Sequence, residues 1–468
     1  MLTTPDEWLP ILAARLDYRY PRIALLRGYG NGNAPLPEMG KNLRASWLAF
    51  QAKARTNYGG LCVGSLADRL RLLSILIGDD AESPASKQAR RIWRDNRMDV
   101  QLADFVDDYL TCGIGYLAEG SEDGRAAITR EIPEQFIAAV DPLHPWKARA
   151  ALKVWRDPDE GFDYAMVWVH GERQRYSRSS FVPGYDSTIT ILRMVACGGW
   201  EKDGDPELYD GDPPVVVFER KGGQGLFEPH IDVIDRINLG KLQRLVIAAM
   251  QAFRQRALKK TGPGGAATAT DQDGNDVDLA VMFEPAPGAL WDLPEGIDIW
   301  ESQQTDIRPL LEGEKADARD FAAVTRTPLS AFTPDGANQS ATGSTNQASE
   351  QIAQARNEIT RLTPGLAVAL VYALRIEGVD LGDETVEVVF ENPAIVSMSE
   401  KYAAAAQAKA SGMTWDSIAR TILGWSPDQV AQDSAARTEE QLSAMTLVQA
   451  SIGQQPPMAS RADAQPVA

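Results

Sequence analysis

The chain has 468 residues, a formal net charge of -18 at pH 7 and a pI near 4.8. Its length is sufficient for several domains with buried cores. The acidic balance argues against a general nucleic-acid binder, because the field of the whole molecule repels phosphates, although a local basic stripe still acts within a Debye length.

Cysteine usage and hydropathy indicate the compartment. Cys62, Cys112 and Cys197 lie far apart and form no CxxC pair, which fits a reducing compartment without disulfides or structural zinc. Residues 1–15 lack the pattern of a signal peptide. No apolar run reaches about 18 residues. We therefore expect a soluble, intracellular protein with no membrane span.

The N-terminal region reads as helices joined by loops. Apolar residues recur there at three-and-four spacing, and Gly113 and Gly115 lie where a helix is expected to stop. The expected helices cover residues 7–16, 23–29, 42–54, 58–72, 84–96 and 100–111.

Between Tyr116 and Phe218 the period of the apolar residues changes to two, which is typical of strands. The expected strands cover residues 115–118, 126–132, 136–140, 150–155, 163–170, 175–180 and 215–219. Turn clusters separate them. The pattern predicts an antiparallel β-rich domain with helical flanks, and an α+β protein overall.

A basic segment follows. Residues 231–260 carry seven Lys/Arg against two Asp and are expected to form one helix from about residue 228 to 260, roughly 45 Å long. The basic side chains of interest are Arg244, Arg254, Arg256, Lys259 and Lys260. Their charge is equally compatible with an ordinary solvated face and with a surface that meets a partner.

The next segment is acidic. Residues 261–305 carry nine Asp/Glu and no Lys or Arg, a contrast that favours a dedicated electrostatic role, either repelling DNA or meeting a basic partner. Its acidic cluster comprises Asp271, Asp273, Asp276 and Asp278. An EF-hand needs Gly at position six and Glu at position twelve, where this chain has Asp276 and Met282. A hairpin turn is therefore favoured over a metal site, with strands at 279–283 and 297–300.

Helices dominate the C-terminal part. We expect helices at 306–325 and 344–374, the second bent or split at Pro364, a strand at 384–390 and three helices in 397–450. Residues 454–468 are expected to be disordered. Residues 333–345 form a polar loop, interpreted either as a surface connection or as a mobile loop that projects into a cavity. Its polar side chains include Asp335, Asn338, Gln339, Ser340, Thr342 and Ser344.

Catalytic signatures are weak. Residues 221–225 resemble a phosphate loop but lack the closing GKS or GKT. His144, His170 and His230 have no metal-ligand spacing, and the chain contains no GxSxG motif. We expect no catalysis, metal or cofactor. The alternatives are an intracellular enzyme with a dispersed, unrecognised active site, or a helical virion or scaffold protein without a channel.

Five short motifs in a fixed order carry a family resemblance. They are LRGYG at 26–30 with LP at 36–37, NYGGLCVGSLADRL at 57–70, CGIGY at 112–116, PVVVF at 214–218 and RTPLS at 326–330. Together, over about residues 15–450, they resemble the portal protein family of tailed bacteriophages, in its siphophage branch.

The resemblance implies a head–tail connector: a ring of about twelve copies, a dodecamer, at one capsid vertex, with double-stranded DNA packaged and ejected through its centre. It also implies a portal-type fold. The implied parts are a wing at 1–227, stem helices at 228–260 and 306–326, a clip at 261–305, a tunnel loop at 327–345, a long helix with a wing strand at 346–394, and a crown with a disordered tail at 395–468.

The resemblance further implies roles and partners. The basic side chains of residues 244–260 would face the DNA channel, the polar side chains of residues 335–344 would belong to the tunnel loop, and the acidic cluster would belong to the clip. The large terminase and then a head–tail adaptor would bind at the clip, with scaffold and major capsid proteins around the wing. The protein would assemble in the host cytoplasm and reside in the virion.

Overall fold

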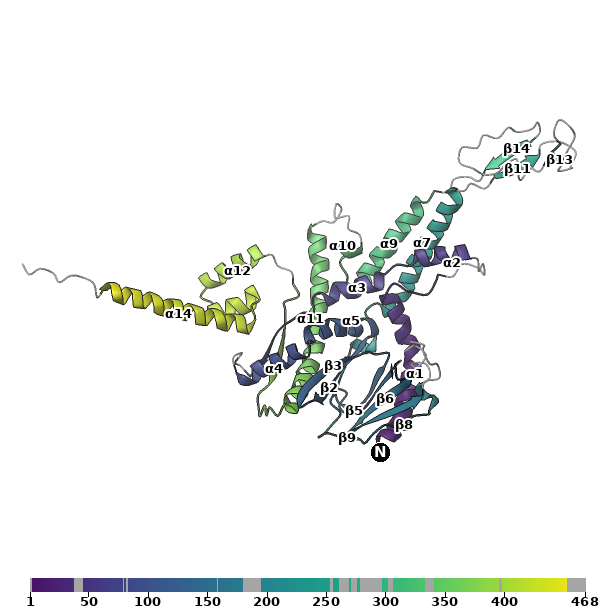
Figure 1. The fold of residues 1–468 in the computed structure, drawn as a ribbon. Coiled ribbons are helices and arrows are strands. Elements are labelled where there is room, and N and C mark those ends of the chain that lie inside the picture. Colours follow the sequence, from purple (N-terminus) through teal and green to yellow (C-terminus); the bar gives the residue numbers. More distant parts are fainter. Residues whose placement is uncertain are drawn as a thin grey trace, which may run out of the picture. The chain divides into compact units, whose positions relative to one another are not determined.

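A computed structural model of the chain is shown in Figure 1. It describes residues 2–37, 45–78, 80, 83–157, 159–179, 195–252, 256–260, 269–270, 276–277, 297–301, 306–332, 341–394 and 398–452. The chain divides into two compact units. The first comprises residues 1–35, 57–231 and 322–468, and the second comprises residues 36–56 and 232–321.

The first unit begins with one long helix, α1, Pro5–Gly30. Leu12, Leu16 and Ile23 are all fully buried, so a single apolar stripe continues through the polar stretch between them. The expectation of two separate helices at 7–16 and 23–29 is therefore wrong. Pro21 lies inside α1 because burial on both sides of it outweighs the local cost of a helical proline.

Three further helices follow in the N-terminal part of this unit, as expected. They are α3 Tyr58–Ala67, α4 Pro84–Asp95 and α5 Met98–Cys112. Helix α5 ends at Gly113, which adopts φ 78° as a left-handed C-cap and confirms the predicted stop.

Two antiparallel sheets form the middle of the first unit and confirm the predicted β-rich region. One has the order β10-β2-β3, and the other has the order β4-β5-β6-β7-β8, with β9 also paired to β7. The strands are β2 Ile114–Glu122, β3 Arg125–Glu131, β4 Phe136–Val140, β5 Ala148–Asp157, β6 Phe162–Val169, β7 Glu172–Ser179, β8 Glu201–Lys202, β9 Glu207–Leu208 and β10 Val215–Glu219.

A third pairing was not expected. Strand β1, Leu72–Ile77, pairs antiparallel with β15, Val386–Phe390. The expected helix at 58–72 instead ends at Ala67, and the reading of the first hundred residues as purely helical is wrong. A short apolar run such as LLSILI has no periodicity that distinguishes a buried strand from a helix, and its partner lies far along the chain.

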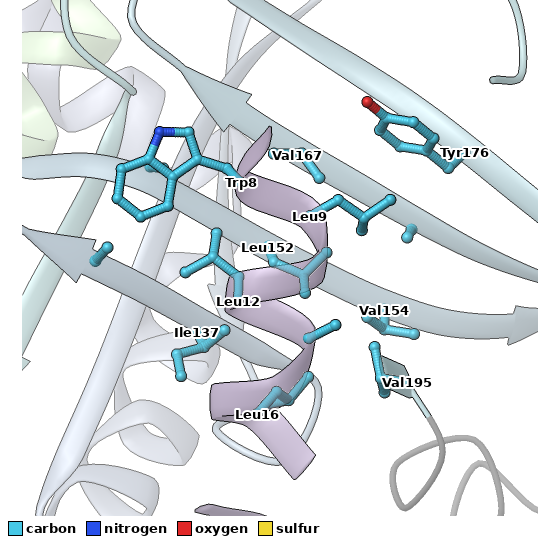
Figure 2. Packing of buried hydrophobic residues seen from close by; sticks show 14 of the residues in the cluster. Trp8, Leu9, Leu12, Leu16, Ile137, Leu152, Val154, Val167, Tyr176 and Val195 are labelled. Carbon is cyan, nitrogen blue, oxygen red and sulfur yellow. The ribbon is translucent and has the colours of Figure 1, made fainter. Parts of the chain in front are cut away.

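The larger sheet is covered on one face by α1. Figure 2 shows Trp8, Leu9, Leu12 and Leu16 of α1 packed with buried side chains of the sheet, among them Val167. A second cluster, which includes Tyr116, Phe136 and Trp168, joins the larger sheet to the β10-β2-β3 sheet. The two sheets therefore pack together, with α1 on the outer side of one of them.

Helix α11, Ala341–Ile376, packs against β2, β10 and β15 and runs through Pro364 as one helix. Leu362, Leu366 and Leu370 are buried at helical spacing. Its segment Ser349–Ile376 is long and apolar enough to cross a membrane by length and composition alone, but a core helix passes the same test.

The short helix α10, Leu329–Phe332, contacts α3, where the ring of Phe332 meets that of Tyr58. The C-terminal helices α12 Met398–Ala410, α13 Trp415–Ile418 and α14 Pro427–Ile452 form a small cluster of their own, with a π-helical turn at Ala419–Leu423. Ala405, Ile418 and Leu423 share one apolar core within the α12–α14 part. The three helices expected at 397–450 are confirmed.

The second unit contains the helices α2 Ala45–Ala54, α7 Ile231–Ala252 and α9 Arg308–Thr325. Two short antiparallel pairs accompany them, β11 Arg256–Lys260 with β14 Ile297–Glu301, and β12 Ala269–Thr270 with β13 Asp276–Val277. The β12–β13 pair confirms a hairpin around the acidic cluster, and β14 confirms the strand expected at 297–300. The strand expected at 279–283 lies outside the described residues.

The basic helix is shorter than expected. It ends at Ala252, so the prediction of one helix to residue 260 is wrong, and Arg256–Lys260 form β11. The register places Leu258 opposite Ile299 and Ala257 opposite Trp300. Pairing with this β-branched and aromatic partner strand outweighs the helix propensity of the Arg/Lys-rich segment.

Candidate functional site

The strongest sequence candidate for contact with DNA was the basic helix, now α7. In the second unit its arginines face acidic side chains of α9. Arg236 Nε lies 2.9 Å from Asp317 Oδ1 and Arg236 Nη2 lies 3.7 Å from Asp320 Oδ2. Arg244 Nε donates to Glu314 Oε1 at 2.9 Å. Both arginines therefore act first as counter-charges between two helices.

The net formal charge of helices α7 and α9 together is zero. Together α7 and α9 contain six Lys/Arg and six Asp/Glu, although the α7 helix by itself has a small basic excess. Burial lowers the pKa of Lys241, with Glu314 acting in the opposite direction. The pair is thus neutral with charge of both signs, because four of the seven basic residues of 231–260 (Arg254, Arg256, Lys259 and Lys260) lie beyond the end of α7.

Apolar and amide contacts hold the helix α2 segment against α7. Ala54, Leu242 and Val246 form a buried cluster with Phe50 and Leu245. Asn238 is 1% exposed, and its Oδ1 accepts hydrogen bonds from Thr56 N at 2.9 Å and from Thr56 Oγ1 at 2.8 Å. These contacts fix the rotation of α7 about its axis and, with it, which charges remain exposed.

The other sequence candidates are distributed as follows. Arg256, Lys259 and Lys260 lie on β11, Asp276 on β13, and Thr342 and Ser344 on α11. The register places Arg256 opposite Glu301 and Lys259 opposite Asp298, so each of these two basic positions lies across from an acidic one. Residues outside the described part of the chain are Arg254, Asp271, Asp273, Asp278, Asp335, Asn338, Gln339 and Ser340.

The polar loop is shorter than expected. Helix α11 begins at Ala341, so Thr342 and Ser344 are helical and the expected loop boundary at 345 is wrong. Ser and Thr are poor formers of helix interiors but are accepted near a helix N-terminus, where their hydroxyl groups satisfy free backbone N–H groups. The composition of this stretch therefore concealed the first turn of the helix.

The Arg244–Glu314 pair supports a prediction. Arg244→Glu should lower the free energy of unfolding by about 1 kcal/mol, because it places two carboxylates together at a partly buried site. Glu314→Arg should have a similar effect, and the double exchange should recover most of the loss. Urea denaturation of the four proteins in a double-mutant cycle measures this. Additive effects of the two changes would show that the side chains do not interact.

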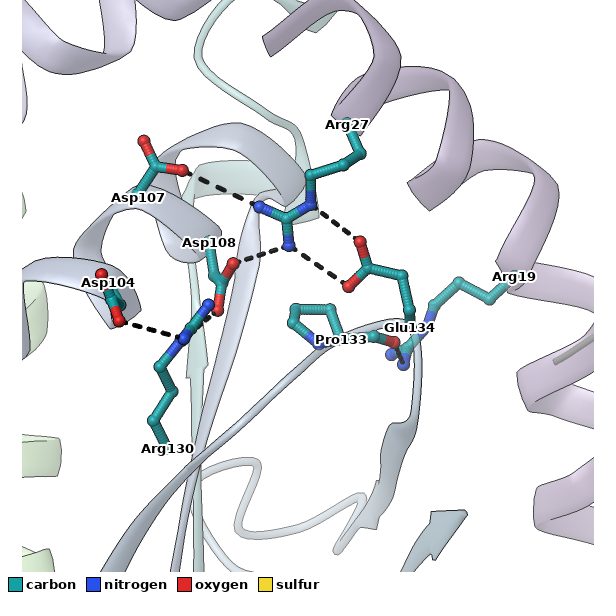
Figure 3. A network of polar contacts seen from close by, with 8 residues as sticks. All are labelled: Arg19, Arg27, Asp104, Asp107, Asp108, Arg130, Pro133 and Glu134. Carbon is teal, nitrogen blue, oxygen red and sulfur yellow. Dashed lines mark hydrogen bonds and ion pairs between the residues drawn. The ribbon is translucent and has the colours of Figure 1, made fainter. Parts of the chain in front are cut away.

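Sequence reasoning missed a buried polar cluster in the first unit, which we call the Asp108 hub (Figure 3). Asp108 is 1% exposed and accepts hydrogen bonds from Arg27 Nη2 and Arg130 Nε, both at 2.6 Å. Arg27 Nε also donates to Glu134 Oε1 at 2.7 Å. Arg130 additionally lies 3.3 Å from Asp104. The hub joins α1, α5, β3 and the segment before β4.

Arg27 belongs to the LRGYG motif, which was the available signal for the hub. The LRGYG motif lies against the NYGGLCVGSLADRL motif at 57–70. The backbones approach so closely that a Cβ at Gly59 would lie 2.9 Å from Tyr29 O, and a Cβ at Gly60 would overlap Gly30 O. The N-terminus of α3 can approach the end of α1 only because these glycines lack side chains. The motif residues therefore build a junction within the first unit.

Cys62 and Cys112 of this unit are buried, whereas Cys197 is exposed. Burial raises the pKa of Cys62 to about 11 and that of Cys112 to about 12, so both thiols are protonated at neutral pH. In the part of the chain that the structure describes, no group of three or more His, Cys, Asp or Glu side chains is arranged to hold a metal ion.

Three comparisons relate the chain to known proteins. A family model described as phage portal protein, SPP1 Gp6-like, matches residues 12–444. A comparison with curated proteins finds no significant match. The neck of a native gene transfer agent particle, computed with C12 symmetry, is similar at 13% identity and a TM-score of 0.47, covering 87% of this chain and 99% of that chain. An HK97-family phage portal protein from Corynebacterium diphtheriae is similar at 14% identity and a TM-score of 0.33, covering 73% and 98%.

Proposed function

Because the chain belongs to the phage portal protein family, SPP1 Gp6-like, we propose that it forms a ring-shaped channel at one capsid vertex through which double-stranded DNA is packaged and ejected. The family match over residues 12–444 carries this proposal. The protein is then a structural component of the virion, the head–tail connector. The alternative of an enzyme with a dispersed active site receives no support from that match.

The neutral α7–α9 pair is consistent with a channel wall. DNA must slide through a channel, and every lysine or arginine bound to phosphate adds affinity that opposes movement. Six basic and six acidic residues on the two helices, with Arg236 and Arg244 already paired to α9, leave little basic charge available to the phosphates. We assign α7 and α9 as the stem.

The remaining parts are assigned by the same family pattern. We propose residues 1–227 with β15 as the wing, 261–305 as the clip, 327–340 as the tunnel loop and 398–452 as the crown. The sequence of the proposed clip contains nine Asp/Glu and no Lys or Arg, and we propose that these residues give it an acidic collar. Such a collar suits partners with basic docking surfaces. We propose that the large terminase and then a head–tail adaptor bind there, with scaffold and major capsid proteins around the wing.

Assembly state is the direct test. One chain has a mass of 51.0 kDa, so a closed ring of about twelve copies has a mass of roughly 600 kDa. Mass photometry of the purified full-length chain should show this species, and negative-stain images along its axis should show a central hole. A chain that stays monomeric at all concentrations, in the presence of capsid and scaffold proteins as well, would contradict the proposal.

A further inference from the structure

A pocket of about 640 Å³ lies in the first unit between β2, the β9–β10 connection and α11. Its apolar walls come from Trp168, Leu208, Tyr209, Val368 and Tyr372. Pockets of roughly 300–1,000 Å³ that combine apolar walls with a few polar groups are typical ligand sites. The Asp108 hub and the α7–α9 pair lie elsewhere and contribute nothing to its lining.

Glu119 of β2 lines this pocket and has no partner. The residue is 2% exposed, and within the described part of the chain neither carboxyl oxygen accepts a hydrogen bond. Burial raises the pKa of Glu119 well above its ordinary value, and Glu119 in turn helps burial to raise the pKa of Tyr372. A buried carboxyl without a partner is costly, so it favours any ligand that supplies a donor.

The pocket has a second unsatisfied polar atom. Trp168 is 6% exposed, and its Nε1 donor likewise lacks an acceptor among the described residues. Glu119 and Trp168 both line the site, and their unsatisfied polar atoms are buried beside its aromatic walls. A ligand that matches it carries a donor group, an acceptor oxygen and an apolar body.

Two of the basic side chains of the rim, Arg173 and Lys147, are engaged elsewhere. Arg173 Nε donates to Glu207 Oε2 at 2.9 Å, and Lys147 Nζ lies 3.6 Å from Asp212 Oδ2. Arg375 lines the rim from α11, but no ion pair joins it to Glu119 in the described structure. The internal counter-charge that usually accompanies a buried carboxylate is thus missing.

We propose that this pocket, the Glu119 pocket, binds an ammonium or guanidinium group carried on an apolar stem. On binding, the Glu119 carboxyl would release its proton to solvent and accept hydrogen bonds from the cation, and such charge-assisted hydrogen bonds are among the strongest that proteins form. The stem would lie against Trp168 and Tyr372, whose rings also attract cations. An oxygen beside the stem, such as a backbone carbonyl, would accept from Trp168 Nε1.

Two sources supply this chemistry: a small organic amine, or a lysine or arginine side chain of a second copy of the chain. Leu208 at the rim is 80% exposed, and Trp146, next to Lys147 of the rim, is 65% exposed. A subunit that contacts the rim would cover these two apolar side chains. They favour the second copy, which a ring would place beside each subunit.

The test uses the full-length monomer separated by size exclusion. The probe is Nα-acetyl-lysine amide, and the matched uncharged probe is Nα-acetyl-norleucine amide. Calorimetric titration should show the lysine probe binding at least about tenfold more tightly. Glu119→Gln should abolish that preference, whereas Glu207→Gln, at the rim of the same pocket, should retain it.

The folding of the variants is checked separately. Glu119→Gln removes an unpaired buried carboxyl without changing its shape, so its melting temperature should equal or exceed that of the wild type. A well-folded Glu119→Gln protein that still prefers the lysine probe would overturn the proposal. Absence of any preference in the wild-type monomer would also overturn it and would identify the pocket as water-filled.

The same titration on the assembled ring separates the two sources. If the ring still binds the lysine probe, the pocket remains open and takes a free amine. If only the monomer binds it, a side chain of the neighbouring copy fills the pocket, and Glu119→Gln rings should dissociate at lower denaturant concentration. The monomer measurement stands even if no ring forms, so failure of the proposed function is distinguishable from failure of this inference.

Discussion

Replacing Asp108 by asparagine should lower the free energy of unfolding of the full chain by about 3 kcal/mol, one of the two largest effects that we expect. The Asp108 carboxylate is 1% exposed and shared by Arg27 and Arg130, each 2.6 Å away. An amide removes the shared counter-charge and leaves two guanidinium groups facing each other. Urea denaturation of the monomer, followed by tryptophan fluorescence, measures the loss.

Asp107 supplies the matched control for this experiment. It is the neighbouring residue on α5, its side chain is 54% exposed, and it lies 3.8 Å from the same Arg27. Asp107→Asn should change stability by no more than about 0.5 kcal/mol, because an exposed ion pair is screened by solvent. Equal losses of unfolding free energy in the two variants would show that burial of the Asp108 hub does not determine how much the hub contributes to stability.

Gly113→Ala should have an effect of similar size, a loss of about 3 kcal/mol or more. Gly113 has a φ of 78°, and a Cβ there would lie 2.5 Å from the backbone carbonyl carbon of Gln224 and 2.6 Å from Gly223 O. Both neighbours are backbone atoms, which cannot rotate away. The segment before α7 must then move from the end of α5, and thermal unfolding should record the loss.

Gly124 is a control that separates the two causes of that loss, the left-handed backbone conformation and the close approach of other backbone atoms. Its φ of 77° matches that of Gly113, but no atom lies within 4 Å of a Cβ placed there. Gly124→Ala should therefore cost only the left-handed conformation, about 1 kcal/mol. If both alanine variants melted at the same temperature, the close approach at Gly113 would contribute nothing.

Local signals were sufficient for many elements. Strands β4, Phe136–Val140, and β10, Val215–Glu219, begin and end where alternation of apolar residues predicted. The end of α5 at Gly113 followed from a glycine in the position that a C-cap requires. In each case the pattern is contained within a few consecutive residues, so no distant contact was needed to recognise it.

Signals that depend on distant partners were missed. Strand β1 pairs with β15 from the other end of the chain. The end of α7 before β11 depends on the partner strand β14. The Asp108 hub joins Arg27 to Glu134 and Arg130 across separate elements. No window of neighbouring residues contains both halves of these contacts.

The features of the candidate site can also be divided into those that the sequence predicted and those that only the tertiary structure decided. By itself the sequence determined the type of most elements but not of β1 and β11, and it also determined the acidity of the chain, the motif order of the portal family and the position of Arg244 on a helix. Tertiary structure decided which charges are neutralised: Arg244 pairs with Glu314, whereas Glu119, unremarkable in the sequence, is buried without a partner. The physical reason is that composition counts charges, but solvation and pairing depend on which side chains the fold brings together.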